Sequence, residues 1–352
     1  MRPNVAVLLA RLLCVQAHGS ALLKMQDVRV ALDAVTLASR AAAEMQSRAV
    51  TSVQKNDASP VTVADFTVQA LILSRLASAF PGDRFIAEES SVELLSSGAA
   101  VINAVVDAVC EFGGGAPTAA SVCAALDLGG TGAVDGWSAT SRTWVLDPID
   151  GTKGFVRGDQ FAVALALLEE GQPVLGLLGC PKADRPLAGG SIFWAKRGHG
   201  AFRRPVGEAA DGLAQDVRIR VDPLTDPERV VSTEAAEATH TSFGRSGAAL
   251  GKLGFDVAKP IRIDGQGKYG LVACGEAHVY MRLPREGCSA TLAHAHPSHD
   301  PPNPPTQYPP NPPTQPIPQP HPSPVPQPHP SPKPHTPLSL LIDCSSYATQ
   351  VR

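Results

Sequence analysis

Proline sets the outer limit of what this chain can fold into. The chain has 352 residues and 33 prolines, and most of the prolines follow Gly287. In that region the sequence reads PPNPPTQ twice and PQPHPSP twice. Such a segment favours an extended polyproline II conformation and has no apolar periodicity from which to build a core. We therefore expect residues 288–352 to be a disordered Pro-rich tail, with ordered structure ending near Arg285.

The net charge, the apolar runs and the cysteines indicate which partners and which compartment to expect. The formal net charge of -3 argues against a general affinity for nucleic acids or anionic membranes. No run of 18 or more apolar residues is present, so we expect no transmembrane helix. The seven cysteines are odd in number and include no Cys-x-x-Cys pair, which favours reduced thiols over a disulfide framework. We therefore expect an intracellular protein with neither a nucleic acid nor a membrane as partner.

The first twenty residues leave the compartment open. Arg2 and Arg11 flank a short apolar run, and no acidic residue occurs before Asp27. Arg11 interrupts the apolar core that a secretory signal needs. Residues 1–20 are therefore either a targeting segment for a chloroplast or mitochondrion or the start of the first helix. Both a cytoplasmic and an organellar location remain open.

Between these ends the sequence pattern mixes helices and strands. Residues 22–54 and 62–79 are predicted helices, and Thr62 is the expected N-cap of the second. A composition shift at 204–216 divides the region into an N-terminal domain, 21–205, and a C-terminal domain, 206–287. A helix leading into a strand is expected at 268–282. Other strands are expected at 85–87, 143–146, 161–169, 173–180, 192–195, 200–202, 217–221 and 230–233.

Three groups of acidic residues stand near predicted strand ends or a helix start. Asp147 and Asp150 follow the strand at 143–146, Glu88 follows the strand at 85–87, and Asp65 lies near the start of a helix. Each group alone has an ordinary explanation, such as an Asp-Gly turn, a solvated acid or a helix cap. Together they suit Mg²⁺, which prefers hard oxygen ligands from carboxylates, water and phosphate. The pattern therefore predicts a magnesium site.

Longer segments around these acids resemble a known superfamily. Residues 147–168 read DPIDGTKGFVRGDQFAVALALL, residues 59–70 read SPVTVADFTVQA, and residues 268–284 read KYGLVACGEAHVYMRLP. They resemble the Mg²⁺-dependent, lithium-sensitive phosphatases that include inositol monophosphatases and fructose-1,6-bisphosphatases. The KGFVRGDQ extension at 153–160 is similar to that of 3'(2'),5'-bisphosphate nucleotidases, whereas inositol monophosphatases typically have an Asn-Phe pair after Asp-Gly-Thr. The resemblance covers roughly residues 25 to 285.

The resemblance implies a fold and a set of metal ligands. The fold would be α/β, an α+β layered sandwich like that of inositol monophosphatase and fructose-1,6-bisphosphatase. Two or more Mg²⁺ ions would be bound by Glu88, Asp147, Asp150 and the carbonyl oxygen of Ile149.

The resemblance also implies roles in catalysis and substrate binding. Asp65 would pair with the Thr152 hydroxyl and orient or deprotonate the attacking water. Thr152 would also bind the substrate. His240, Lys268 and Arg282 would hold the nucleotide and its 5'-phosphate, with the alternative that Lys268 and Arg282 are ordinary surface charges.

The chain departs from the family pattern in two places. Gly265 stands where the family usually has Ser, so one hydroxyl donor is lost. After Pro284 the family continues with Trp-Asp-x-Ala-x-Gly, and residues 285–352 contain no such segment. The last metal-binding aspartate of the family is therefore absent. We expect the second domain to be truncated, with an unpaired sheet edge.

Three functions follow from these observations. The first is Mg²⁺-dependent removal of the 3'-phosphate of adenosine 3',5'-bisphosphate and of 3'-phosphoadenylyl sulfate, which belongs to sulfur metabolism. The second is the same chemistry on an inositol phosphate. The third is a truncated, inactive relative that binds nucleotide or a partner, with the Pro-rich tail contacting SH3- or WW-type domains.

Overall fold

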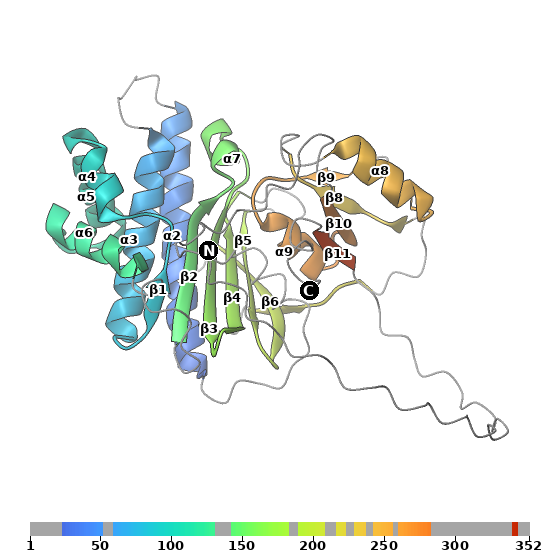
Figure 1. Cartoon of the computed structure of the whole chain (residues 1–352), viewed down its shortest axis with the longest axis horizontal. Coiled ribbons are helices and arrows are strands. Elements are labelled where there is room, and N and C mark those ends of the chain that lie inside the picture. The colour runs from blue at the N-terminus through green and yellow to red at the C-terminus, as the bar shows by residue number, and fades with distance from the viewer. Residues whose placement is uncertain are drawn as a thin grey trace, which may run out of the picture.

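The computed structural model describes residues 23–51, 59–130, 142–182, 189–207, 216–222, 229–236, 242–255, 260–282 and 340–343. These residues form two sheets with helices on their faces (Figure 1). Helices α2 and α3 cover one face of the larger sheet, and α9 lies between the two sheets. This arrangement confirms the predicted layered α/β sandwich.

The larger sheet has seven strands in the order β1-β2-β3-β4-β5-β6-β7. Only β1 and β2 pair in parallel, and each later neighbour pairs antiparallel. Its strands are β1 Arg84–Ile86, β2 Arg142–Asp150, β3 Ala162–Glu169, β4 Gln172–Cys180, β5 Ser191–Lys196, β6 Gly200–Pro205 and β7 Val217–Ile219.

The smaller sheet has the order β11-β10-β8-β9, and its neighbouring strands all pair in parallel. Its strands are β8 Ser232–Glu234, β9 Ile261–Arg262, β10 Val279–Arg282 and β11 Leu340–Asp343. The helices of the described residues are α2 Met25–Thr51, α3 Pro60–Ala79, α4 Ser91–Ser96, α5 Ala99–Gly113, α6 Ala119–Asp127, η1 Leu128–Gly130, α7 Thr152–Arg157, α8 Phe243–Lys252 and α9 Gly267–Ala273.

The predicted hairpin of β3 and β4 is confirmed. Glu170 and Gly171 connect the strands, and both have positive φ angles, 51° and 70°. Two-residue hairpin turns with positive φ at both positions match the twist of the flanking strands. Every residue of β3 is buried. The strand therefore runs through the middle of the protein, between α2 on one face and α9 on the other.

Helix α3 begins two residues earlier than predicted. Its N-cap is Ser59 and Pro60 occupies the first turn, so the prediction of Thr62 as N-cap is wrong. Proline favours this position because its fixed φ suits a helix and its missing N–H is not needed there. The helix is long and apolar enough over Val61–Ala79 to cross a membrane by composition alone, but 67% of that stretch is buried inside the protein. It serves here as a core helix.

Two of the predicted boundaries differ from the structure. Strand β7, at Val217–Ile219, pairs with β6, so the predicted division at 205/206 falls inside the larger sheet. Strand β11, at Leu340–Asp343, lies in the segment predicted to be disordered and pairs with the outer edge of β10. Residues 340–342 are apolar and include no proline, so each keeps the backbone N–H that a strand needs. The rest of 288–352, and residues 1–20, lie outside the described residues.

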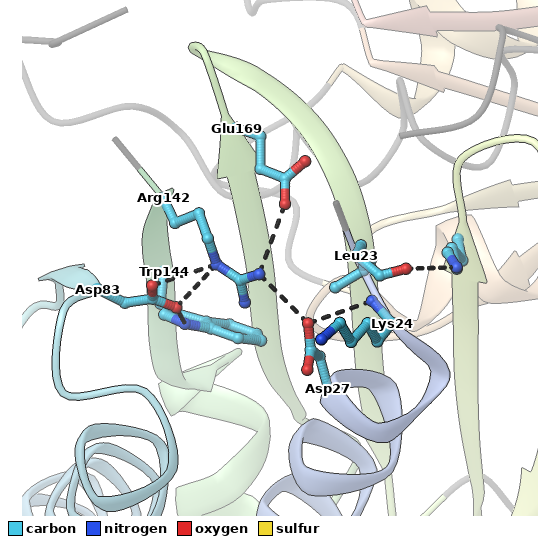
Figure 2. A network of polar contacts seen from close by, with 8 residues as sticks. Leu23, Lys24, Asp27, Asp83, Arg142, Trp144 and Glu169 are labelled. Carbon is cyan, nitrogen blue, oxygen red and sulfur yellow. Dashed lines mark hydrogen bonds and ion pairs between the residues drawn. The ribbon is translucent and has the colours of Figure 1, made fainter. Parts of the chain in front are cut away.

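Arg142 ties the start of β2 to three other elements (Figure 2). Its guanidinium lies 3.2 Å from Asp27 of α2, 3.1 Å from Asp83 before β1 and 3.7 Å from Glu169 at the end of β3. The indole N–H of Trp144 donates to Asp83 at 2.8 Å. These acids are only 9–13% exposed, and Arg142 is 23% exposed. One cation therefore compensates three largely buried carboxylates.

We expect Arg142→Met to lower the free energy of unfolding by about 2–3 kcal/mol, somewhat less than for a fully buried pair, because three carboxylates lose their shared cation. Urea unfolding at pH 7, followed by circular dichroism, measures the change. Arg48→Met is the matched control, since its ion pairs with Glu44 and Glu111 are about half exposed and should change stability little. Equal losses for the two variants would contradict the assignment.

Candidate active site

Parallel pairing of β1 and β2 brings two of the acidic segments to one sheet edge. Ile86 stands opposite Val145 in this pair. Two residues further along each strand direction are Glu88 and Asp147. Because parallel neighbours end at the same edge, the two carboxylates project from adjacent positions. The parallel pairing, rather than either strand alone, brings these acids together. We call Glu88, Asp147 and Asp150, which ends β2, the acidic edge.

Helix α3 supplies the third acid and holds the second in place. Asp65 and Gln69 are four residues apart and so lie on one face of the helix. The fully buried Gln69 amide donates to the Glu89 carbonyl at 2.7 Å and accepts the Glu89 N–H at 2.9 Å. This clamp fixes the backbone beside Glu88 next to Asp65. Sequence reasoning missed Gln69, although a polar residue four positions after Asp65 in an apolar helix was a usable signal.

The Asp147–Thr152 segment leaves the regular sheet as it approaches its end. Its pairing with β3 becomes irregular between Asp147 and Asp150. Gly151 then takes a left-handed conformation, with φ of 96°, and α7 begins. The Thr152 hydroxyl donates to the Ile149 carbonyl at 3.4 Å. The predicted pairing of Thr152 with Asp65 stays a prediction.

Burial and mutual repulsion perturb the acids at this edge. The pKa of Asp147 is raised well above its usual range, first by burial and then by the charges of Asp150, Glu88 and Asp65. The pKa of Asp65 is raised to about 8, first by burial and then by Glu89 and Glu88. Both shifts have the same cause: Asp65 and Asp147 lie in a poorly solvated region, and each faces neighbouring carboxylates.

Asp150 differs from the other acids because the second sheet assists it. Burial raises its pKa, but the Lys268 ammonium and a hydrogen bond with the Gln266 backbone lower it. Both contacts come from the segment around the start of α9. Asp150 is therefore the acid of the larger sheet that contacts the segment around the start of α9.

The donor chemistry at this edge fits a hard divalent cation. Asp147 Oδ1 and Asp150 Oδ2 are buried and have no hydrogen-bond partner. Anionic oxygens of this kind are what Mg²⁺ prefers. Within the residues that the structure describes, no group of three or more His, Cys, Asp or Glu side chains has the spacing of a formed metal site. The fit therefore rests on the type of donor and on the two unpartnered carboxylate oxygens of Asp147 and Asp150.

We expect the Mg²⁺-free protein to carry a pH-dependent penalty at Asp65. Below its ordinary pKa of 3.8 the carboxyl is protonated in both folded and unfolded chains, so the penalty is absent. As the pH rises from 3.8 to about 8, the unfolded chain releases this proton while the folded chain retains it, and stability falls. Thermal unfolding of wild type and Asp65→Asn in EDTA should show the variant's advantage growing from pH 5 to pH 8. An advantage that shrinks with pH would refute this.

The structure changes the interpretation of the predicted nucleotide-binding residues. Lys268 is 7% exposed, and its ammonium donates to the Ile263 carbonyl at 3.2 Å and to the Gly265 carbonyl. The alternative that Lys268 is an ordinary surface charge is therefore wrong. His240 and the side chain of Arg282 lie outside what the structure describes. Their roles stay predictions.

Comparison with known proteins agrees with this architecture. The sequence profile of the inositol monophosphatase family matches residues 23–290. The chain belongs to this family. The motif-based prediction of the superfamily is thus confirmed. Inositol monophosphatase family members use Mg²⁺, which agrees with the oxygen donors at the acidic edge.

Within the inositol monophosphatase family the chain is similar to several nucleotidases. It is 35% identical to 3'(2'),5'-bisphosphate nucleotidase 1 of Arabidopsis thaliana over 288 residues, which cover 74% of this chain and 78% of the relative. It is 37% identical to 3'(2'),5'-bisphosphate nucleotidase of Oryza sativa over 284 residues, covering 74% and 76%. A solved structure, CysQ of Bacteroides thetaiotaomicron, shares 21% identity at a TM-score of 0.46, with 75% of this chain and 81% of that one covered.

Proposed function

We propose that the chain is a Mg²⁺-dependent phosphomonoesterase that removes the 3'-phosphate of adenosine 3',5'-bisphosphate, releasing AMP and phosphate, and also acts on 3'-phosphoadenylyl sulfate. The observation that carries the proposal is the acidic edge formed by Glu88, Asp147 and Asp150 beside Asp65. Relatives named as 3'(2'),5'-bisphosphate nucleotidases support the choice of substrate.

The residues at the acidic edge have distinct proposed roles. Glu88, Asp147, Asp150 and the Ile149 carbonyl would hold two or more Mg²⁺ ions. Bound magnesium would activate water and stabilise charge on the phosphoryl oxygens. Asp65, held beside the edge by α3, would orient the attacking water and accept its proton.

The nucleotide half is proposed to lie against the second sheet. His240 and Arg282 would contact the nucleotide and its 5'-phosphate, because their cationic or donor groups suit phosphate oxygens. Lys268 would contact the nucleotide from its buried position at the start of α9. The absence of the Trp-Asp-x-Ala-x-Gly segment from residues 285–352 supports weaker binding of the second ion.

Phosphate release from three substrates in Mg²⁺ tests the proposal. We expect kcat/KM for adenosine 3',5'-bisphosphate to exceed that for inositol 1-phosphate by roughly 100-fold, because polar contacts made for a nucleotide would be left unpaired. The rate for 3'-phosphoadenylyl sulfate should be comparable to that for the bisphosphate, and EDTA should stop both reactions. A preference for inositol 1-phosphate would replace the proposed substrate. A folded protein without any Mg²⁺-dependent release would favour the inactive, binding alternative.

A further inference from the structure

A loop of the second sheet packs directly on the acidic edge. The loop comprises residues 263–266, which connect β9 to α9, and includes Asp264, Gly265 and Gln266. A Cβ atom on Gly265 would lie 2.5 Å from the Asp150 carbonyl oxygen, and one on Gly151 would lie 2.9 Å from the Gly265 nitrogen. The two backbones approach this closely because both residues are glycines. The loop and the segment that carries Asp150 are therefore one packed unit.

An ion pair joins the same loop to α7, the helix that follows Asp150. The Arg157 guanidinium at the end of α7 contacts the Asp264 carboxylate through Nη2 and Oδ2. Asp264 is 7% exposed, so its charge depends on a protein partner for compensation. Helix and loop also meet at Gly154, where a Cβ atom would lie 2.8 Å from Asp264 Oδ2.

The opposite side of α7 is held by the long helix α2. The side-chain amide of Gln46, which is fully buried, donates to the Phe155 carbonyl at 3.0 Å and to the Asp159 carbonyl at 2.9 Å. Gln46 thus fixes helix α7 to α2, and Arg157 fixes it to the loop of the second sheet. Neither contact involves a predicted metal-binding or substrate-binding side chain.

We propose that Arg157 and Asp264 are positioning residues whose ion pair locks the second-sheet loop onto α7 and so holds Asp150 in place for Mg²⁺. The consequence for catalysis rests on the proposed function, whereas the consequence for Mg²⁺ binding does not. Supporting partners behind metal ligands are typically worth 10- to 100-fold in metal affinity or activity.

Replacing Arg157 distinguishes a positioning role of this residue from a simple effect of its charge on Mg²⁺ binding. Arg157→Met takes a positive charge away from an acidic region, so electrostatics alone would strengthen Mg²⁺ binding. Loss of positioning would weaken it. We expect Arg157→Met to lower Mg²⁺ affinity about tenfold, measured by isothermal titration calorimetry on the full chain. Arg157→Lys should recover part of the loss because it keeps the charge without the paired N–H geometry.

A double-mutant cycle tests whether the loss of Mg²⁺ affinity comes from the Arg157–Asp264 ion pair. Asp264→Asn should also weaken Mg²⁺ binding, and Arg157→Met combined with Asp264→Asn should cost no more than the worse single variant. Asp159→Asn is the matched control: its carboxylate pairs with the same guanidinium at 2.9 Å but is 58% exposed. It should leave Mg²⁺ affinity within about twofold of wild type.

Several results would overturn the proposal. These are Mg²⁺ affinity in Arg157→Met that is unchanged or higher, strictly additive effects in the cycle, or an equal loss in Asp159→Asn. Circular dichroism checks folding, and Arg157→Lys and Asp264→Asn keep the test decisive if Arg157→Met does not fold. If wild type binds Mg²⁺ but releases no phosphate from the bisphosphate, the proposed function fails while calorimetry still tests the ion pair.

Discussion

Replacing Asp147 with Asn is expected to lower kcat for Mg²⁺-dependent phosphate release by at least about 1,000-fold, because a lost metal carboxylate removes several kcal/mol of transition-state stabilisation. The same change should raise the melting temperature of the Mg²⁺-free protein. Burial and the charges of Asp150 and Glu88 destabilise the ionised Asp147 carboxylate, and a neutral amide of the same shape relieves that repulsion.

This prediction is specific because Asp147→Asn is expected to lower the activity and to raise the stability of the Mg²⁺-free protein. Thermal unfolding in EDTA and again in saturating Mg²⁺ gives the stability half, and the phosphate-release assay gives the other. Mg²⁺ should stabilise wild type, by selective binding to the folded state, and should stabilise Asp147→Asn much less.

The matched control for Asp147→Asn is Asp83→Asn. It makes the same chemical change in an acid that is 10% exposed but paired with Arg142. That variant should lose stability and keep its activity. If Asp147→Asn proves less stable than wild type without Mg²⁺, the repulsion inferred between carboxylates at the acidic edge is not there.

The second large effect is expected at Asp65. Asp65→Asn should lower kcat by about 100- to 10,000-fold, the range for a group that accepts a proton during the reaction. Its Mg²⁺ affinity should change little, because the proposed metal ligands are on β2 and after β1, whereas Asp65 lies on α3.

Comparison of kcat with calorimetric Mg²⁺ affinity separates the two roles that Asp65 could have. A loss of Mg²⁺ affinity as large as the loss of kcat would make Asp65 a metal ligand instead. A kcat within threefold of wild type would leave it without a role in the reaction.

Much of the fold follows from local signals. The hairpin of β3 and β4 was predictable because Glu170-Gly171 separates two apolar runs, and the strand leading into Asp147 was predictable from its own residues. The start of α3 was mistaken by two residues because Pro60 favours the first helical turn more strongly than Thr62 favours the N-cap. Strand β11 is not predictable in this way, because the composition of the tail favours disorder and the short apolar run 340–342 forms a strand only by pairing with β10.

Some predictions depend on features outside the described residues. An intracellular location, binding of SH3- or WW-type domains by the Pro-rich tail, and truncation of the second domain stay predictions. So does the role of His240.

The sequence by itself determined which acidic residues are candidates for the site and which family the chain resembles. Asp147, Asp150, Glu88 and Asp65 were identified because strand ends and a helix start carry their own local signals, and the residues after Asp150 carried the resemblance to nucleotidases. Only the tertiary structure decided what supports those acids. Gln46, Gln69 and Asp264 act on residues 20 to 113 positions away through hydrogen bonds and an ion pair. Contacts of that kind depend on which strands pair and which helices cover them, and no local pattern in the chain encodes that choice.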